Sequence, residues 1–144
     1  MWSDGINQYT DEEFLKLIKN HKELYIGSDS QYTRHHTNYV TAVCFRMYPG
    51  IGYYYKKERT SKYASDIRTR IWNEVERSIS TALWLKSEYP DKKYEVHCDI
   101  NSNPKHRSNQ FHEAASGYVR GCGFEYKCKP ESFAASGAAD NHTR

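Results

Sequence analysis

Apolar and polar positions along the chain follow two periods, one typical of β-strands and the other of α-helices. Five short runs rich in β-branched and aromatic residues predict strands. They are expected at residues 24–28, 38–48, 52–61, 94–101 and 124–129. The Pro-Gly turn between the second and third runs predicts a hairpin, which we expect to pair antiparallel with the first strand.

Apolar residues spaced three and four positions apart predict the helices. A short helix at about residues 10–20 begins with Thr10 and Glu13, which have the spacing of a capping box. A long helix begins near Ser65 and ends before Pro90. Its apolar stripe consists of Ala64, Ile67, Ile71, Val75, Ile79, Ala82 and Leu83.

Two further helices follow, one capped by Ser108 and one built mostly of Ala, Ser and Gly from about Ser132. After the leading helix, the order of elements is therefore β-β-β-α-β-α-β-α. The later crossovers must make parallel pairings, whereas the first three strands form a meander. We predict a single α/β domain over residues 1–144, with a mixed five-stranded sheet, helices on both faces and residues 124–129 at an edge.

Two carboxylates stand at strand ends in this arrangement. Asp29 follows the first apolar strand, and Asp99 lies near the end of the fourth. Ligands of open α/β sheets bind at the carboxyl ends of parallel strands, so the two acids share a site if their strands are neighbours. Like charges this close require that one group protonates or that a cation binds between them. The first strand is therefore predicted to be central, with the fourth beside it.

Helical acids can complete this site. Glu74 and Glu76 flank the apolar stripe of the long helix on opposite sides, and periodicity does not choose between them. Asp140 lies on the last helix among small residues that permit close approach to a sheet. Four hard oxygen donors suit two Mg²⁺ or Mn²⁺ ions and phosphodiester hydrolysis. Taken singly, each acid is also explained as a surface charge or a turn residue.

Polar neighbours of these acids are weaker candidates. His142 could shuttle a proton or act as an outer-shell metal group, and a terminal histidine without function is the alternative. Turn residues Ser30 and Gln31 could position a phosphate or water. Three residues beyond Asp99 could hold a substrate phosphate, or simply form a solvated loop. They are Asn101, Lys105 and Arg107.

The charge distribution permits nucleic-acid binding without requiring it. The chain carries 21 Lys and Arg against 18 Asp and Glu, a formal net charge of +3. Basic residues cluster at 56–57, 68–70, 105–107 and 127–129, with tyrosines between them. Cations interleaved with aromatic rings suit a phosphate backbone with stackable bases, although a solvated basic face explains them equally well.

Several classes are disfavoured. No apolar run approaches the roughly 20 residues of a membrane-spanning helix, and the start lacks the features of a secretory signal, so we expect a cytoplasmic protein without a membrane partner. The four cysteines form no C-x-x-C and are predicted to be reduced thiols. The chain contains no G-x-S-x-G element, and Gly121-x-Gly123 precedes a strand, which disfavours a serine hydrolase and a dinucleotide loop.

Five motifs in order resemble the RNase H-like superfamily, most closely the YkuK-type family of predicted RNase H-related nucleases. They are IGSDSQ at 26–31, WNEVERS at 72–78, HCDIN at 97–101, GCGFEYKCKP at 121–130 and AASGAADNHTR at 134–144. The resemblance implies a two-metal nuclease whose ligands are Asp29, Glu74, Asp99 and Asp140. It favours Glu74 over Glu76, because the spacing of Glu74 and Ser78 matches the family.

The sequence leaves the substrate and the rival functions open. No insertion resembles the basic handle helix that hybrid-binding RNases H often carry, which disfavours recognition of an RNA–DNA hybrid. The sequence does not distinguish RNA from DNA as the substrate. A domain that binds nucleic acid or serves as a scaffold without catalysis is the alternative to a nuclease. A metal-dependent hydrolase of small phosphoesters is a third possibility. Oligomeric state and the choice between exo- and endonuclease are also open.

Overall fold

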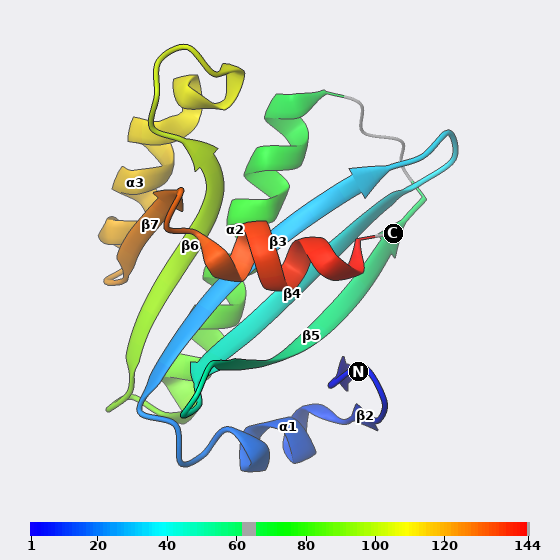
Figure 1. Ribbon diagram of the computed structural model, residues 1–144, viewed down its shortest axis with the longest axis vertical. Helices are drawn as coiled ribbons and strands as arrows, with labels where there is room; N and C mark the ends of the chain where they lie inside the picture. Colours follow the sequence, from blue (N-terminus) through cyan, green and yellow to red (C-terminus); the bar gives the residue numbers. More distant parts are fainter. Residues whose placement is uncertain (62–65, 144) are drawn as a thin grey trace.

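The computed structural model describes residues 1–61 and 66–143, which form one mixed sheet between two helical layers (Figure 1). Within these residues the sheet has seven strands in the order β2-β1-β5-β4-β3-β6-β7. They are β1 (Trp2–Ser3), β2 (Gln8–Tyr9), β3 (Glu23–Tyr32), β4 (Thr37–Arg46), β5 (Ile51–Thr60), β6 (Lys93–Asn101) and β7 (Glu125–Lys129). The five predicted strands are all present, and β7 lies at an edge as expected. The first strand was predicted to end at residue 28, but pairing with β4 continues β3 to Tyr32, so Asp29 lies inside the strand and Ser30 and Gln31 are strand residues rather than turn residues.

The prediction of five strands is wrong in number, because β1 and β2 extend the sheet beyond β5. Each has two residues, too few to display the alternation that marks a strand. Ser3 pairs with Tyr55, and Trp2 stacks on Phe14 with ring centroids 4.1 Å apart. Aromatic packing therefore holds the first residues against the sheet.

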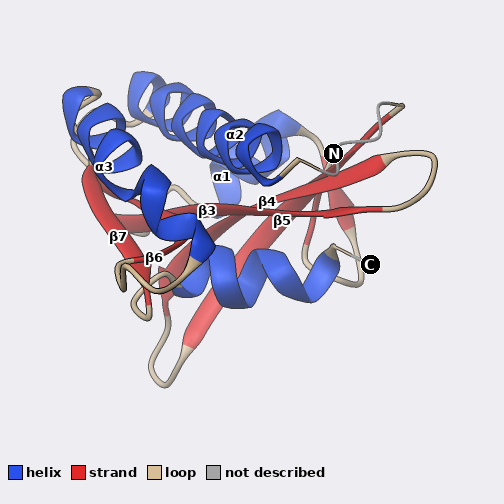
Figure 2. Cartoon of the chain, turned by 90° about the horizontal axis from the view of Figure 1, so that it is seen from above, coloured by secondary structure: helices blue, strands red, loops and turns tan. Residues whose placement is uncertain are grey.

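Helices cover both faces of the sheet (Figure 2). One face carries α2 (Ile67–Glu88) and α3 (His112–Gly121), the latter preceded by the 3₁₀ turn η1 (Arg107–Phe111). The other face carries the π-helical segment η2 (Ala134–Ala139) and the 3₁₀ turn η3 (Asp140–His142). The leading helix α1 (Asp11–Leu17) is shorter than the predicted 10–20.

Local signals account for some helix boundaries and not for others. Both hydrogen bonds of the capping box between Thr10 and Glu13 are present at α1. Ser108 is not a helix cap: its hydroxyl lies inside η1 and accepts the backbone N–H of Asn101. Leu83 is exposed, because the buried stripe of α2 continues from Ala82 to Leu85. The predicted helix start near Ser65 and the stripe position Ala64 lie outside the described residues.

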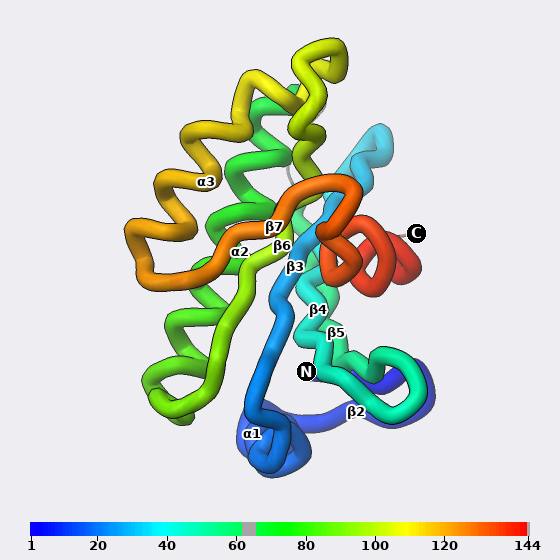
Figure 3. The backbone as a smooth tube through the Cα atoms, turned by 60° about the vertical axis from the view of Figure 1, so that its left-hand side comes forward, coloured from blue at the N-terminus to red at the C-terminus, as the bar shows by residue number. Residues whose placement is uncertain are grey.

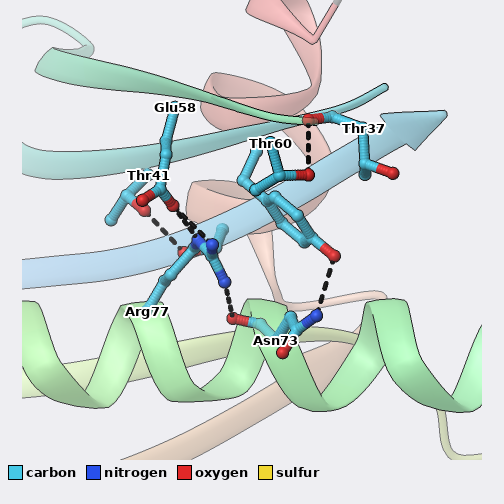
Figure 4. A network of polar contacts seen from close by, with 8 residues as sticks. Thr37, Thr41, Glu58, Thr60, Asn73 and Arg77 are labelled. Atoms are coloured by element: carbon cyan, nitrogen blue, oxygen red, sulfur yellow. Dashed lines mark hydrogen bonds and ion pairs between the residues drawn. The ribbon is translucent and has the colours of Figure 1, made fainter. Parts of the chain in front are cut away.

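An ion pair and hydrogen bonds tie α2 to the hairpin of β4 and β5 (Figure 4). Arg77 Nη2 lies 2.5 Å from Glu58 Oε2 on β5, and its guanidinium stands over the Tyr39 ring at 3.9 Å. Asn73 Nδ2 donates to Tyr39 Oη at 2.9 Å. These contacts fix the rotation of α2, and hence the side from which Glu74 approaches the sheet.

Strand β3 is central, as predicted, with β6 beside it. It pairs antiparallel with β4 and parallel with β6. The parallel pairing ends at Gly27 and His97, and Asp29 and Asp99 each follow two residues later. The two acids therefore stand just beyond the last residues that β3 and β6 pair.

The terminal segment η2 lies directly on β3 and β4 (Figure 3). A Cβ atom on Gly27 would overlap the backbone of Ala134 and Ala135, so only glycine permits this approach. The backbone N–H of Ala134 also donates to His97 Nδ1 at 3.1 Å. The small residues of η2 were predicted to allow close contact, and Gly27 supplies the matching position on the sheet.

The four cysteines are free, as expected for reduced thiols. They were also expected to be buried, which holds for Cys44 and Cys98, whereas Cys122 and Cys128 are half-buried. No helix among residues 1–61 and 66–143 is long and apolar enough to cross a membrane.

Candidate functional site

A groove of about 390 Å³ opens at the carboxyl ends of β3 and β6. Three of the four predicted acids contribute to its wall, together with three basic side chains and a histidine-containing loop. The lining residues are Asp29, Ile67, Arg70, Ile71, Glu74, Asp99, His106, Arg107, Ser108 and Lys129. The groove thus brings together side chains from five separate elements and the loop after β6.

The end of the pairing between β3 and β6 allows acids from opposite faces of the sheet to line one groove. Asp29 and Asp99 project to the face covered by η2, as shown by the hydrogen bond from Ser136 Oγ to Asp99 Oδ1 at 3.0 Å. Glu74 approaches from α2 on the opposite face and accepts a 2.5 Å hydrogen bond from Ser30 Oγ. A continuous ladder between β3 and β6 would separate these two sets of carboxylates.

Burial and mutual repulsion dominate the electrostatics of Asp29 and Glu74. Both residues are 8% exposed. Burial raises the pKa of Asp29, and the charge of Glu74, a hydrogen bond with Asp140 and the charge of Asp99 raise it further. Burial likewise raises the pKa of Glu74, against the opposing effect of the Ser30 hydrogen bond. Without a cation between them, this pair resists ionisation at neutral pH.

Asp99 has a cationic partner. Lys129, the last residue of β7, places its Nζ 2.9 Å from Asp99 Oδ1. This hydrogen bond raises the pKa of Lys129, and the charges of Asp99, Asp29 and Asp140 add to the effect. The same Asp99 oxygen accepts from Ser136, so it already has two donors.

Asp140 joins the cluster from the start of η3. Its side chain contributes to the raised pKa of Asp29, so the two carboxyls lie close to each other. Asp140 is exposed, unlike Asp29. The last predicted acid therefore reaches the first-strand acid, as the small residues of η2 suggested.

The structure distinguishes the two glutamates of α2. Glu74 is buried and lines the groove with Asp29 and Asp99. Glu76 instead accepts a 2.7 Å hydrogen bond from Tyr118 Oη of α3. Glu74 is thus the acid that α2 contributes to the site.

The donor set fits a hard divalent cation, because all four acids supply carboxylate oxygens and a cation would relieve the repulsion between Asp29 and Glu74. In the part of the chain that the structure describes, however, no three His, Cys, Asp or Glu side chains are grouped as metal ligands. The chemistry of the donors supports metal binding, and the binding itself is a proposal.

The remaining predicted residues are divided between the groove and its surroundings. Arg107 lines the groove, whereas Lys105 is exposed on the loop outside its wall. Asn101 organises that loop, since its Oδ1 accepts the Asn103 N–H at 2.8 Å. Gln31 is exposed and accepts from Thr143 Oγ1 at 3.4 Å.

His142 lies against β5 and does not line the groove. Its ring stacks on Tyr55 at 3.8 Å between centroids, and its Nε2 lies 2.8 Å from Tyr53 Oη. Burial lowers its pKa. This placement fits a side chain that anchors η3 beside Asp140, and a proton-transfer role stays a prediction.

Sequence reasoning did not assign Arg70, Lys129 or Ser136 to the site. Arg70 and Lys129 belonged to basic clusters that were considered only for their charge. The available signals were the position of Arg70, four residues before Glu74 on the same helix, and that of Lys129, at the end of a strand. Arg70 Nε is the one buried side-chain polar atom without a hydrogen-bond partner among the described residues. Its guanidinium stands 4.6 Å from the centroid of the Tyr32 ring.

Comparisons with known proteins give one match. The sequence model of a family described as Ribonuclease H-like matches residues 6–144. No curated protein and no solved structure matches the chain.

Proposed function

Because the chain belongs to the ribonuclease H-like family, we propose that it is a divalent-metal-dependent nuclease that hydrolyses phosphodiester bonds of nucleic acid with two metal ions. The observation that carries the proposal is the convergence of Asp29, Glu74 and Asp99 on one groove, with Asp140 close enough to raise the pKa of Asp29. The family is compatible with a nuclease, and the four acids occupy the elements on which its ligands are expected.

The four acids divide into a buried pair and an outer pair. Asp29 and Glu74 would hold Mg²⁺ or Mn²⁺ where their charges repel most strongly, and Asp99 and Asp140 would complete the coordination of two ions. When bound, such ions activate a water and stabilise the leaving oxygen of the phosphodiester. Ser30 orients Glu74 through its hydrogen bond, and Ser136 orients Asp99.

The basic lining of the groove would hold the substrate. Arg70 and Arg107 lie in the same wall as the acids and offer guanidinium donors to phosphate oxygens. The buried Nε of Arg70 has no partner within the described chain, so a phosphate oxygen would satisfy it. These contacts position a backbone and do not by themselves distinguish RNA from DNA.

The rival function is a domain that binds nucleic acid, or acts as a scaffold, without cleaving anything. Such a domain would gain nothing from burying Asp29 against Glu74, because uncompensated carboxylates destabilise the fold. The acid cluster therefore favours catalysis. We further propose that the chain lies in the YkuK-type branch, on the five ordered motifs noted above.

A nuclease assay with matched variants tests the proposal. Wild type, Asp29→Asn and Glu76→Gln are incubated with single-stranded RNA, single-stranded DNA, duplex DNA and an RNA–DNA hybrid, with Mg²⁺, Mn²⁺ or EDTA. We expect cleavage by wild type and by Glu76→Gln with metal, and a loss of at least about 100-fold in Asp29→Asn, since metal-held nucleophiles supply several kcal/mol.

Equal turnover by Asp29→Asn and wild type, or the absence of metal binding to wild type, would overturn the mechanism. Salt-sensitive binding of nucleic acid that is indifferent to EDTA, with no cleavage of any of the four substrates, would instead identify a binding module.

A further inference from the structure

We propose that Lys129 is a built-in counter-ion of Asp99 that controls the binding of the second divalent ion, an inference that rests on the proposed metal-dependent function. The first ion binds at Asp29 and Glu74, and the second must compete with the Lys129 ammonium for Asp99. Lys129 is thus a residue that sets metal occupancy rather than a ligand.

The geometry around Asp99 gives the first argument. Lys129 Nζ lies 2.9 Å from Asp99 Oδ1, and Ser136 Oγ donates to the same oxygen at 3.0 Å. The neighbouring acid Glu131 pairs instead with Lys127, with 3.7 Å between Nζ and Oε2. Lys129 is therefore committed to Asp99 and places a full positive charge on the oxygen that a metal would need.

The contrast with the buried pair gives the second argument. Among the described residues, the ion pairs within 4.0 Å include none with Asp29 or Glu74. Arg70 and Lys129 act on the buried Glu74 only as charges beyond that range, so the buried pair has weaker compensation than Asp99 and attracts a free cation more strongly. A second ion at Asp99 would meet the ammonium at close range, where like charges repel. The two metal positions are consequently unequal.

The side chain of Lys129 has room to leave. It is 44% exposed and has a flexible stem, and it already lines the groove that would hold the substrate. Once displaced from Asp99, the ammonium can pair with a phosphate oxygen in the same groove. Substrate and second metal would then promote each other's binding. A bound phosphate would draw the Lys129 ammonium away from Asp99, and a metal at Asp99 would free the ammonium to pair with phosphate.

Titration of Mn²⁺ into the metal-free protein, followed by calorimetry and by the electron paramagnetic resonance signal of free Mn²⁺, tests the proposal without relying on turnover. Wild type is compared with Lys129→Gln, which removes the charge, and with Lys129→Arg, which keeps it. Lys127→Gln is the matched control on the same strand and outside the groove.

We expect one tighter and one weaker ion in wild type. Lys129→Gln should tighten the weaker ion about tenfold and leave the tighter one unchanged, whereas Lys129→Arg and Lys127→Gln should resemble wild type. If wild type and Lys129→Gln bind the two ions with the same pair of affinities, the role of Lys129 is overturned and the nuclease proposal stays intact. No Mn²⁺ binding to wild type would overturn both.

Discussion

Acidification should destabilise the protein through His97, whose ring lies 1% exposed beneath η2. The backbone N–H of Ala134 donates to its Nδ1, so that nitrogen carries no proton and Nε2–H donates to Glu95 Oε1 at 2.9 Å. The contact with Glu95 is therefore a hydrogen bond from a neutral ring. Burial lowers the pKa of His97 to about 4, with a smaller contribution in the same direction from Lys127.

The sign and size follow from linkage. An unfolded histidine titrates near 6.5, so between pH 6.5 and about 4 the unfolded chain binds more protons than the native one at His97. The contribution of His97 is complete above pH 6.5 and is lost as the pH falls to about 4. The difference of about 2.5 pH units corresponds to roughly 3 kcal/mol of unfolding free energy.

Urea unfolding followed by tryptophan fluorescence at pH 7.0 and pH 4.5 measures this loss. His97→Asn retains an acceptor for the Ala134 N–H and removes the titration, so its stability should depend less on pH than that of wild type. The difference in unfolding free energy between wild type and His97→Asn should be about 2–3 kcal/mol smaller at pH 4.5 than at pH 7.0. A gap that stays constant with pH would refute the assignment of a neutral, buried His97.

Two further perturbations test the site from its packing and its charge. Gly27→Ala should destabilise the protein by about 1–3 kcal/mol and weaken Mn²⁺ binding, because its methyl group would displace η2, whereas Gly117→Ala, with open space around its Cβ position, should not destabilise it; equal thermal midpoints for wild type and Gly27→Ala would contradict the contact. Asp29→Asn should stabilise the metal-free protein at pH 8 by about 1–3 kcal/mol, because a carboxyl with a raised folded pKa loses stability as the pH rises from its unfolded pKa through its folded one. Mn²⁺ at about 100 times its Kd should add about 2.7 kcal/mol to the unfolding free energy of wild type and much less to that of Asp29→Asn. The charge argument would be refuted if Asp29→Asn were less stable than wild type without metal and gained as much stability from Mn²⁺ as wild type does.

The backbone of the site could be predicted from the sequence because its determinants are local. The apolar runs before Asp29 and around Asp99 mark two buried strands, and the order of elements makes those strands neighbours. Alternation along β6 also separates the core residues Val96 and Cys98 from the groove-facing Asp99. These inferences need only period and connectivity.

What escaped prediction depends on contacts between distant segments. The ion pair of Lys129 with Asp99 joins two strands whose register no local pattern gives. Periodicity did not choose between Glu74 and Glu76, and only the family resemblance favoured Glu74, because the choice depends on the rotation of α2, which Arg77 and Asn73 fix against the hairpin. Strands β1 and β2 were missed because two residues carry no period.

The end of the ladder between β3 and β6 also has a mechanical consequence. Asp29 and Asp99 stand on adjacent strands of one sheet, two residues beyond the last paired residues, so the pairing of β3 with β6 sets their spacing. Glu74 and Asp140 are mounted on separate helical layers, one on each face. Sliding of either layer would change their reach without altering the sheet. The two halves of the site therefore depend on different contacts: strand pairing positions Asp29 and Asp99, and the contacts of the helical layers with the sheet position Glu74 and Asp140.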